Sequence, residues 1–322
     1  MVLCDNLGMD KRVKGIASAL VGASLWGVSG TCSQFLLANY AISSLFITMV
    51  RASVSAVLFL SIIAMRRREA FGEAFADARI LRQLVAFGVI GLFASQITYL
   101  VAIGHTNGGT ATVLQSTSIV IIMAVTCIQC RCAPKPLEIA GLLFAFTGVV
   151  LIATQGDLGS LRLPAAGLAW GLASAVGATC YSMLPRPLYA KWDSFTVVGL
   201  GMAVSALASA AIWGSAFVFP GIDEAVNGGN AVGSALVPEL DAAGVAALAA
   251  ISVVGTFGAY YLYLNGIALV GAVRGSQLGA IEPVSATVCS AVFMGTAFSV
   301  FDWAGLVLMV ATIIMVAASS RA

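Results

Sequence analysis

Apolar residues gather into ten long segments that are separated by short polar connections. Most segments run to about 20 residues, and at ~1.5 Å rise per residue a helix of that length crosses roughly the 30 Å hydrocarbon core of a bilayer. The short alternating strands of an outer-membrane barrel do not fit this pattern. The pattern therefore predicts an all-α integral membrane protein with ten transmembrane helices. They cover residues 15–37, 43–65, 83–104, 109–130, 135–154, 166–185, 195–219, 243–268, 272–294 and 302–319.

The second half of the chain repeats the first half. One offset of 164 residues aligns Val89-Ile90-Gly91-Leu92-Phe93 with Val253-Val254-Gly255-Thr256-Phe257, and Ala140-Gly141-Leu142 with Ala304-Gly305-Leu306. The starts of the halves, Gly15-x-Ala17 and Gly167-x-Ala169, match at an offset of 152. Because each half holds an odd number of predicted spans, five, the halves are expected to be inverted relative to each other. Inverted repeats of this kind are typical of secondary transporters, which bind substrate at the repeat interface near mid-membrane.

The two repeats are expected to pack as one structural unit around a central cavity. Residues 1–14 form a cytoplasmic leader whose first eight residues look disordered, residues 15–156 form the first repeat, and residues 157–322 form the second. The connection from Asp157 to Pro164 is too short to be a flexible linker. A Gly-rich and acidic external loop from Pro220 to Asp241 accounts for the change of offset, and we interpret it as a surface insertion, with a lid as the alternative.

Composition excludes an ordinary soluble domain, because 60% of the residues are hydrophobic and only 9% are charged, against roughly a quarter in soluble domains. All Lys and Arg residues except Arg51 and Arg162 fall on one side of the predicted spans, and the acidic loop residues Asp223, Glu224, Glu239 and Asp241 fall on the other. The positive-inside rule makes the basic side cytoplasmic, so both termini are expected in the cytoplasm of a multi-pass cytoplasmic-membrane protein. No basic tract is long enough to suggest a nucleic-acid partner.

Polar residues recur at equivalent positions of the two halves. Gln96 and Tyr99 share a face of the third span, and their counterparts in the eighth span are Tyr260 and Tyr263. Thr112, Gln115 and Ser118 form a stripe along the fourth span, and the counterparts in the ninth span are Ser276, Gly279 and Glu282. Because such stripes lack hydrogen-bond partners in lipid, they predict a water-accessible interior. The alternative is a set of interhelical hydrogen bonds without a cavity.

Two charged residues lie inside predicted spans. Glu282 lies near mid-depth and is followed by the kinking Pro283, so it is a candidate contact for a substrate amine or a proton carrier. Its alternatives are a neutral Glu hydrogen-bonded across the bundle, or an ion pair with Arg51. Arg51 is a candidate counter-charge for a substrate carboxylate, with an external anchor or internal ion pair as the favoured alternative. Weaker candidates are Gln34, Asn265 and Gln277, and Trp26, Trp170, Tyr181, Tyr260 and Tyr263 are candidates for stacking on a substrate.

The residues needed for several other function classes are missing from the sequence. There is one histidine, His105, in a predicted external loop, so neither a zinc pair of the HExxH type nor a buried serine–histidine pair fits. No GxxxxGK[ST] sequence exists, which excludes an ATP-driven pump within this chain. Cys127-x-x-Cys130-x-Cys132 is interpreted as small apolar filling at a helix end rather than as a metal cluster. We therefore predict no enzyme activity, no cofactor and no metal.

The chain resembles the EamA-like, ten-helix bacterial branch of the drug/metabolite transporter superfamily. The resemblance rests on Ser24-Leu25-Trp26-Gly27, Arg51-Ala52, Tyr263-x-x-Gly266-x-Ala268-Leu269, Gly271-Ala272-Val273, Ile281-Glu282-Pro283-Val284, and on Gly141 and Gly305. It implies five-plus-five inverted repeats with the last helix of each half peripheral, alternating access, and export of amino acids, related metabolites or drugs. Departures from the family pattern are Cys130-Arg131 and Thr296-Ala297, where many members carry Glu followed by a basic residue, and Gln34, where Lys is often expected.

The sequence thus predicts a secondary transporter that exports a small amphipathic metabolite, such as an amino acid, across the cytoplasmic membrane. Its expected partners are a small-molecule substrate, the lipid bilayer and coupled protons. A multidrug exporter is one alternative, and a non-transporting membrane scaffold or sensor is another. The expected cavity residues are Trp26, Arg51, Gln96, Tyr99, Gln115, Ser118, Tyr260, Tyr263, Gln277 and Glu282.

Overall fold

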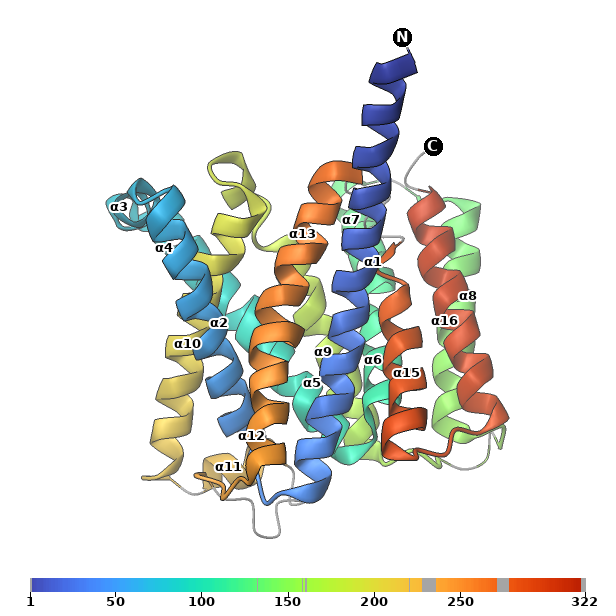
Figure 1. Ribbon diagram of the computed structural model, residues 1–322. Helices are drawn as coiled ribbons and strands as arrows, with labels where there is room; N and C mark the ends of the chain where they lie inside the picture. The colour runs from blue at the N-terminus through green and yellow to red at the C-terminus, as the bar shows by residue number, and fades with distance from the viewer. Residues whose placement is uncertain are drawn as a thin grey trace.

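The computed structural model describes residues 2–131, 133–157, 159, 161–219, 221–227, 236–270 and 278–319, which form helices packed side by side (Figure 1). The helices of the first half are α1 (Val2–Asn39), α2 (Ser44–Arg66), α3 (Glu69–Ala76), α4 (Ala78–Ala86), the π-helix η1 (Phe87–Phe93), α5 (Ala94–His105), α6 (Gly108–Ser116), α7 (Ser118–Cys130) and α8 (Pro136–Thr154). Those of the second half are α9 (Ala165–Met183), the 3₁₀ turn η2 (Leu188–Ala190), α10 (Ser194–Ala216), α11 (Gly221–Asn227), α12 (Ala242–Ala249), the π-helix η3 (Ala250–Gly258), α13 (Ala259–Val270), α15 (Ile281–Met294) and α16 (Val300–Ser319).

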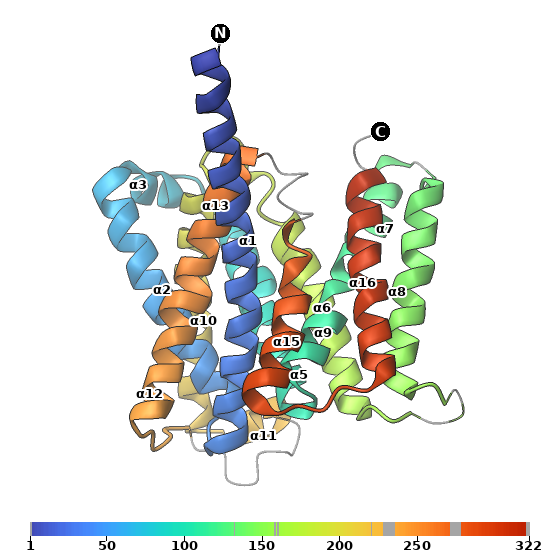
Figure 2. The same ribbon diagram turned by 45° about the vertical axis from the view of Figure 1, so that its right-hand side comes forward.

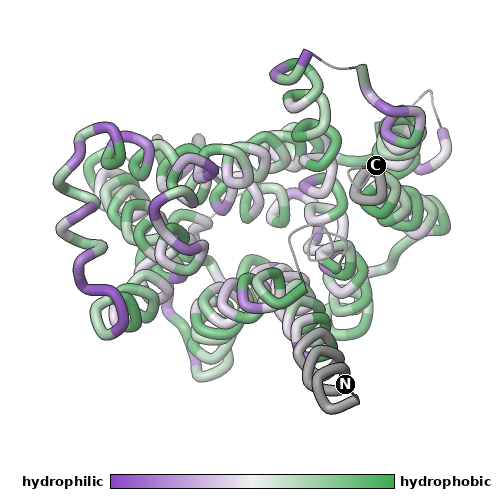
Figure 3. Tube along the Cα trace, turned by 90° about the horizontal axis from the view of Figure 1, so that it is seen from above, coloured by the Kyte–Doolittle hydropathy of each residue, from purple (hydrophilic) through white to green (hydrophobic). Residues whose placement is uncertain are grey.

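Seven helical segments of the described chain are long and apolar enough to cross a membrane. Two of them combine successive elements without a break in the helical path, at Ala78–His105 and Ala242–Val270. The apolar helices Ile281–Met294 and Val300–Met315 are shorter, and α9 has 19 residues. These segments confirm an all-helical integral membrane protein, whereas the total of ten spans stays a prediction. Seen along the bundle, the helices are mainly apolar and the hydrophilic residues gather in connections at this end (Figure 3).

The N-terminal residues differ from the sequence-based expectation. We expected the first eight residues to be disordered, but α1 already begins at Val2 and continues without interruption into the first span. α1 begins and α16 ends at the same end of the bundle, whereas α9, the first helix of the second half, begins at the opposite end (Figure 1).

Small residues let the helices approach closely, as is typical of helix packing in lipid. α1 lies against α13 at Gly22, where an added Cβ would stand 2.6 Å from the backbone nitrogen of Tyr263, and at Gly266, where it would stand 2.5 Å from that of Ala19. α1 also packs on α15 at Gly27, where a Cβ would lie 2.7 Å from the carbonyl oxygen of Glu282. These contacts hold the turn that carries Glu282 against the middle of α1.

The last helices of the two halves, α8 and α16, stand together at the edge of the bundle (Figure 2). An added Cβ at Gly148 would lie 3.1 Å from the carbonyl oxygen of Gly305, and Thr312 Oγ1 donates a 3.0 Å hydrogen bond to the carbonyl oxygen of Gly141. The pair therefore uses the same kind of backbone approach as the centre of the molecule.

Several departures from regular α-helix within the described residues occur at matching places in the two halves. The third and eighth spans each contain a π segment, η1 and η3. The predicted span 109–130 is divided into α6 and α7 at Thr117, and α15 begins after a turn at Gly279 and Ala280. At Thr117 the side-chain hydroxyl bonds the carbonyl oxygen of Leu114 at 2.7 Å, and this local bond competes with the regular helical pattern. The segment Gly108–Cys130 is still one helical path long enough to cross a membrane, in agreement with the predicted span 109–130, and the irregularity at Thr117 lies within it.

Candidate functional site

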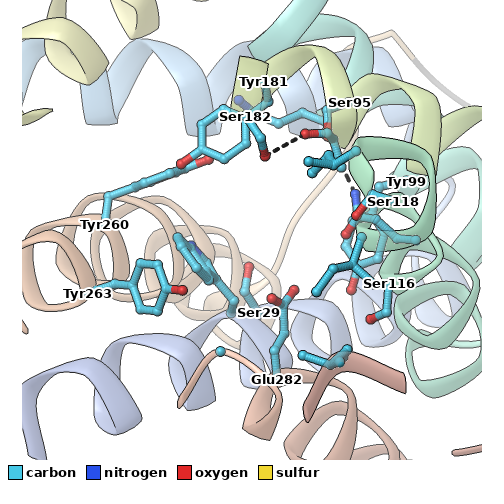
Figure 4. Close-up of a pocket in the computed structure, with 18 of the residues that line it drawn as sticks. Ser29, Ser95, Tyr99, Ser116, Ser118, Tyr181, Ser182, Tyr260, Tyr263 and Glu282 are labelled. Carbon is cyan, nitrogen blue, oxygen red and sulfur yellow. Dashed lines mark hydrogen bonds between the residues drawn. The ribbon is translucent and has the colours of Figure 1, made fainter. Parts of the chain in front are cut away.

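A cavity of about 320 Å³ lies between helices of both halves, at the level of the junction between α6 and α7 and of the first turn of α15 (Figure 4). Four residues on its wall carry most of its polar chemistry, Arg51, Gln96, Gln115 and Glu282. The lining residues are Trp26, Ser29, Arg51, Ser95, Gln96, Tyr99, Gln115, Ser116, Ser118, Ile119, Ile122, Ala178, Tyr181, Ser182, Tyr260, Tyr263, Gly279, Glu282 and Ile313. Both halves therefore contribute polar and aromatic side chains to one space.

Aromatic rings form one wall of the cavity. The Trp26 ring lies 5.0 Å from that of Tyr260 and 4.8 Å from that of Tyr263, measured between ring centroids. Tyr181 continues the row, with its ring 6.0 Å from Tyr260. In Figure 4 the Tyr263 hydroxyl points into the cavity on the same side as Glu282. Edge-to-face rings of this kind give a rigid wall that suits an apolar or cationic group.

The first half supplies a second wall of hydroxyls and amides. Tyr99 and Thr112 share a 2.7 Å hydrogen bond, and because the Thr112 hydroxyl donates to the carbonyl oxygen of Gly108, Tyr99 is the donor of the pair. Gln115 Nε2 donates to Ser95 Oγ at 3.4 Å. Gln96 Nε2 lies 3.7 Å from the sulfur of Met202, while Gln96 Oε1 is buried without a hydrogen-bond partner.

Glu282 lies in the first turn of α15 and faces the cavity (Figure 4). A carboxylate at a helix N-terminus is favoured by the helix dipole, and Pro283, the next residue, needs no hydrogen-bond partner for its nitrogen in that turn. Within the part of the chain that the structure describes, the Glu282 carboxylate makes no hydrogen bond and no ion pair. Neither alternative for Glu282, a cross-bundle hydrogen bond or a pair with Arg51, is therefore seen among these residues.

Arg51 approaches the cavity from α2, and its side chain is 6% exposed. Its Nε donates to Thr256 Oγ1 at 3.2 Å, and Thr256 Oγ1 in turn donates to the carbonyl oxygen of Ile251, five residues earlier in η3. The π segment thus places a hydroxyl where it can hold the guanidinium. Arg51 Nη1 is buried and has no hydrogen-bond partner.

Nine of the ten expected cavity residues lie on the cavity wall, and Gln277 lies outside the described residues. Three weaker candidates do not line the cavity: Gln34 bonds α6 and the connection after α15, Asn265 is exposed, and Trp170 packs into apolar clusters. The prediction missed Ser29, Ser95, Ser116 and Ser182 among the lining residues. The offset of 152 offered a signal for one of them, because it pairs Ser29 with Tyr181, which was a stacking candidate.

On the side of the cavity toward the end of α1, contacts between α1, α6 and α15 close the interface between these helices, which we call a seam. Gln34 Oε1 accepts a 2.9 Å hydrogen bond from the backbone nitrogen of Gly108, and Gln34 Nε2 donates to Thr296 Oγ1 at 2.9 Å. Thr31 and Ser290 share a hydrogen bond of 3.4 Å between their hydroxyls. On the seam between α7 and α9, by contrast, Ile119, Ile122 and Ser182 line the cavity. The cavity therefore extends along α7 toward the end of the bundle at which α1 begins (Figure 1).

No group of three or more His, Cys, Asp or Glu residues within the described ranges is arranged to hold a metal ion. The donors and acceptors on the cavity wall suit an organic molecule with polar groups.

Comparison with known proteins gives a family match over both halves. The family model described as the EamA-like transporter family matches residues 13–154 and again residues 165–318. The chain is 30% identical over 313 residues to a protein of Salmonella typhimurium described as an uncharacterized inner membrane transporter, YicL, covering 97% of this chain and 98% of that protein. A solved structure described only as a crystal structure of a protein superposes with a TM-score of 0.60 at 18% identity, over 97% of this chain and 96% of that one, and so shares the fold.

Proposed function

This chain belongs to the EamA-like transporter family and is a multi-pass inner-membrane transporter, and we propose that it moves a small amphipathic metabolite through its cavity by alternating access. The observation that carries the proposal is the cavity itself, in which both halves place polar groups away from lipid. A scaffold without transport needs no such space, since polar residues of a tightly packed bundle bond each other across helices.

Inverted repeats are the finer part of this proposal, and paired contacts support them. An added Cβ at Gly15 would meet Leu269 and Val270, each at 2.7 Å, and one at Gly167 would meet Thr106 at 2.5 Å and His105 at 3.3 Å. The two sets are equivalent: Gly167 lies 152 residues after Gly15, and His105 and Thr106 lie 164 residues before Leu269 and Val270. In the same way, a Cβ at Gly255 would meet Ser29 at 2.5 Å, and one at Gly91 would meet Tyr181 at 3.1 Å.

The contact between α1 and the turn that carries Glu282 also recurs between the corresponding residues of the other half. The added Cβ at Gly27 would meet the carbonyl oxygen of Glu282, and at the corresponding positions Thr179 Oγ1 donates to the carbonyl oxygen of Ser118 at 3.4 Å. The contacts between α8 and α16 are paired in the same way. The contact of Gly148 with Gly305 corresponds, at the offset of 164, to the hydrogen bond between Thr312 and Gly141. Such two-fold relations within one chain are typical of transporters that rock one bundle against the other.

The proposed state is open toward the cytoplasm, because the cavity extends toward the end at which α1 begins and α16 ends, and the positive-inside rule assigns that end to the cytoplasm. The direction of transport is proposed as export on the family resemblance. Glu282 is the proposed proton carrier or amine contact, and Gln96, Gln115 and the tyrosines form the proposed binding surface.

The test is counterflow in proteoliposomes that contain the purified full chain and a panel of labelled amino acids. We expect uptake of at least one amino acid, and a loss of at least about tenfold in Gln115→Ala, Tyr263→Ala and Glu282→Gln, because each removes a group from the cavity wall. Ser61→Ala, whose exposed hydroxyl bonds only within its own helix, is the matched control and keeps full activity. Unchanged transport in all three cavity variants would refute the proposed site.

A multidrug exporter is a second candidate, and the aromatic wall of Trp26, Tyr181, Tyr260 and Tyr263 favours it. It predicts that bulky organic cations compete with the amino acid in the same assay. If only molecules that carry both a carboxylate and an amine compete, the multidrug exporter is excluded.

A further inference from the structure

We propose that the cavity selects zwitterions and binds them in one orientation, with the substrate carboxylate at Arg51 and its ammonium group at Glu282. This inference rests on the proposed transport function and names the chemical class of its substrate. It begins from polar atoms that the wall of the cavity leaves without partners.

The anionic end is set by Arg51. A buried guanidinium that has lost its water is stable only where anions or acceptors replace that water, and Arg51 has one such bond, from Nε to Thr256 Oγ1. Its Nη1 is buried without a partner although Arg51 lines the cavity. A carboxylate entering the cavity supplies the missing acceptor with a charge-assisted hydrogen bond.

A hydroxyl beside Arg51 completes this end of the site. Ser29 Oγ is also buried without a partner and lines the cavity. Ser29 packs on Gly255, the neighbour of the residue that holds the guanidinium, since an added Cβ at Gly255 would stand 2.5 Å from Ser29 Cβ. Ser29 and Arg51 therefore approach the same turn of η3, and together they offer two donors to one carboxylate.

The cationic end is set by Glu282 and the rings beside it. The carboxylate faces the cavity and has no hydrogen bond or ion pair among the described residues. Trp26 and Tyr263, whose rings lie 4.8 Å apart, stand on the same side of the cavity (Figure 4). An ammonium group is attracted both by the carboxylate and by the faces of such rings, and the rings cover the apolar part of the substrate.

Size and charge balance agree with a small zwitterion. At about 320 Å³ the cavity is at the lower end of the roughly 300–1,000 Å³ found for ligand sites. The wall contributes one positive and one negative side chain that do not pair with each other within the described structure. A zwitterion neutralises both and adds no net charge to the membrane interior, whereas an anion or a cation leaves one wall charge unpaired.

The test measures binding of three probes that share one side chain, phenylalanine, phenethylamine and 3-phenylpropionate, by ligand-induced shifts of melting temperature in detergent. The wild-type chain is expected to bind phenylalanine most tightly. Arg51→Gln should lose at least about tenfold in affinity for phenylalanine and 3-phenylpropionate but keep its affinity for phenethylamine. Glu282→Gln should show the reverse, losing the two amines and keeping the acid.

A second set of probes and two control variants keep the test decisive. Leucine, isoamylamine and 4-methylpentanoate repeat the comparison without an aromatic ring. Arg51→Lys, which keeps the charge, should recover part of the binding of the acid, and Ser61→Ala should match the wild type. Equal losses for all three probes in either variant, or wild-type binding that ignores charge, would overturn the orientation while leaving transport intact. Absence of counterflow for every amino acid would instead overturn the proposed function.

Discussion

At the level of individual side chains, Gly27 is a position that has no room for a Cβ. A Cβ there would stand 2.0 Å from Ser285 Oγ, 2.6 Å from the backbone nitrogen of Ala286 and 2.7 Å from the carbonyl oxygen of Glu282. The serine side chain can rotate away, but the two backbone atoms belong to a helix and move only with it. Gly27 therefore fixes how closely α15, and with it Glu282, approaches α1.

We predict that Gly27→Ala destabilises the protein by about 1–3 kcal/mol, the range found for overpacked sites, and weakens ligand binding because the Glu282 turn is displaced. Gly214→Ala is the matched control, since it also lies in a helix and has nothing within 4 Å of an added Cβ. That variant should be neutral or stabilised by roughly 0.5–1 kcal/mol through the loss of glycine flexibility. Equal stability of the two variants in detergent unfolding would contradict the prediction.

One contact outside the membrane spans, between Tyr40 and Asp241, bears on the stability of the protein in acid. Tyr40, at the end of α1, donates a hydrogen bond to Asp241, which also caps α12 by accepting from the backbone nitrogen of Gly244 at 2.9 Å. The Tyr40 hydrogen bond lowers the pKa of the Asp241 carboxyl below its ordinary value. Because the folded state then binds the proton more weakly than the unfolded state, this stabilisation is present above about pH 4 and is lost as the pH falls further.

Asp241→Asn should therefore flatten the fall of melting temperature between about pH 6 and pH 3, while keeping the helix cap, because Asn caps helices about as well as Asp. Tyr40→Phe should flatten it in the same way by removing the hydrogen bond. An acid transition that is identical in all three proteins would show that Tyr40 and Asp241 do not contribute to it.

Among the helical elements, the π segment η3 positions the hydroxyl that holds Arg51. Its wider turn carries Thr256 to a place where Oγ1 both accepts from Arg51 Nε and donates to the carbonyl oxygen of Ile251. π segments are often found at functional sites, and here the segment orients a charged side chain on the cavity wall.

We predict that Thr256→Val costs about 1–3 kcal/mol of stability, because it leaves Arg51 Nε buried without an acceptor, and that Thr256→Ser costs less because the hydroxyl is kept. A double-mutant cycle measures the coupling. In an Arg51→Gln background the cost of Thr256→Val should shrink, and an unchanged cost would mean that the two residues act independently.

The positions of most helices could be predicted from the sequence, but their irregularities could not. Long apolar segments located the spans, and the offset of 164 identified Tyr260 and Tyr263 through Gln96 and Tyr99. The break at Thr117 depends on a hydroxyl that bonds a carbonyl three residues earlier, and hydropathy does not register such a bond. The serines on the cavity wall were missed for a related reason, since small hydroxyl residues occur equally at packed interfaces, as at Ser33 and Ser55.

At the scale of the whole molecule, the two seams that border the cavity are in different states. Between α1 and α15, Thr31 and Ser290 are hydrogen-bonded. The equivalent residues are Met183, at an offset of 152 from Thr31, and Thr126, at an offset of 164 from Ser290. They belong to α9 and α7, and between these two helices Ile122 and Ser182 line the cavity. The proposed alternating access requires that the second seam closes when the first opens.

We predict that cysteine pairs at these positions form disulfides in a mutually exclusive way. In a background without the seven native cysteines, Thr31→Cys with Ser290→Cys should cross-link in the state described here, because hydroxyls 3.4 Å apart place the two side chains within disulfide reach. Met183→Cys with Thr126→Cys should cross-link only in the opposite state, and not at all once the first disulfide has formed.

Each disulfide should stop counterflow, and reduction should restore it. Simultaneous formation of both cross-links in one molecule, measured by mass shift after thiol labelling, would contradict an exchange between the seams. If the bundle does not move, only the disulfide between positions 31 and 290 should form, and the one between positions 183 and 126 should never form.

The shared π segments also bear on how the molecule arose. η1 and η3 cover residues that the offset of 164 superposes almost completely, Phe87–Phe93 on residues 251–257. An extra residue in a helix is an unusual change, and under the proposed inverted repeats one insertion in a five-helix ancestor would account for both copies. That insertion would then be older than the duplication, and the ancestor would have carried the widened turn while working as two identical subunits of opposite orientation.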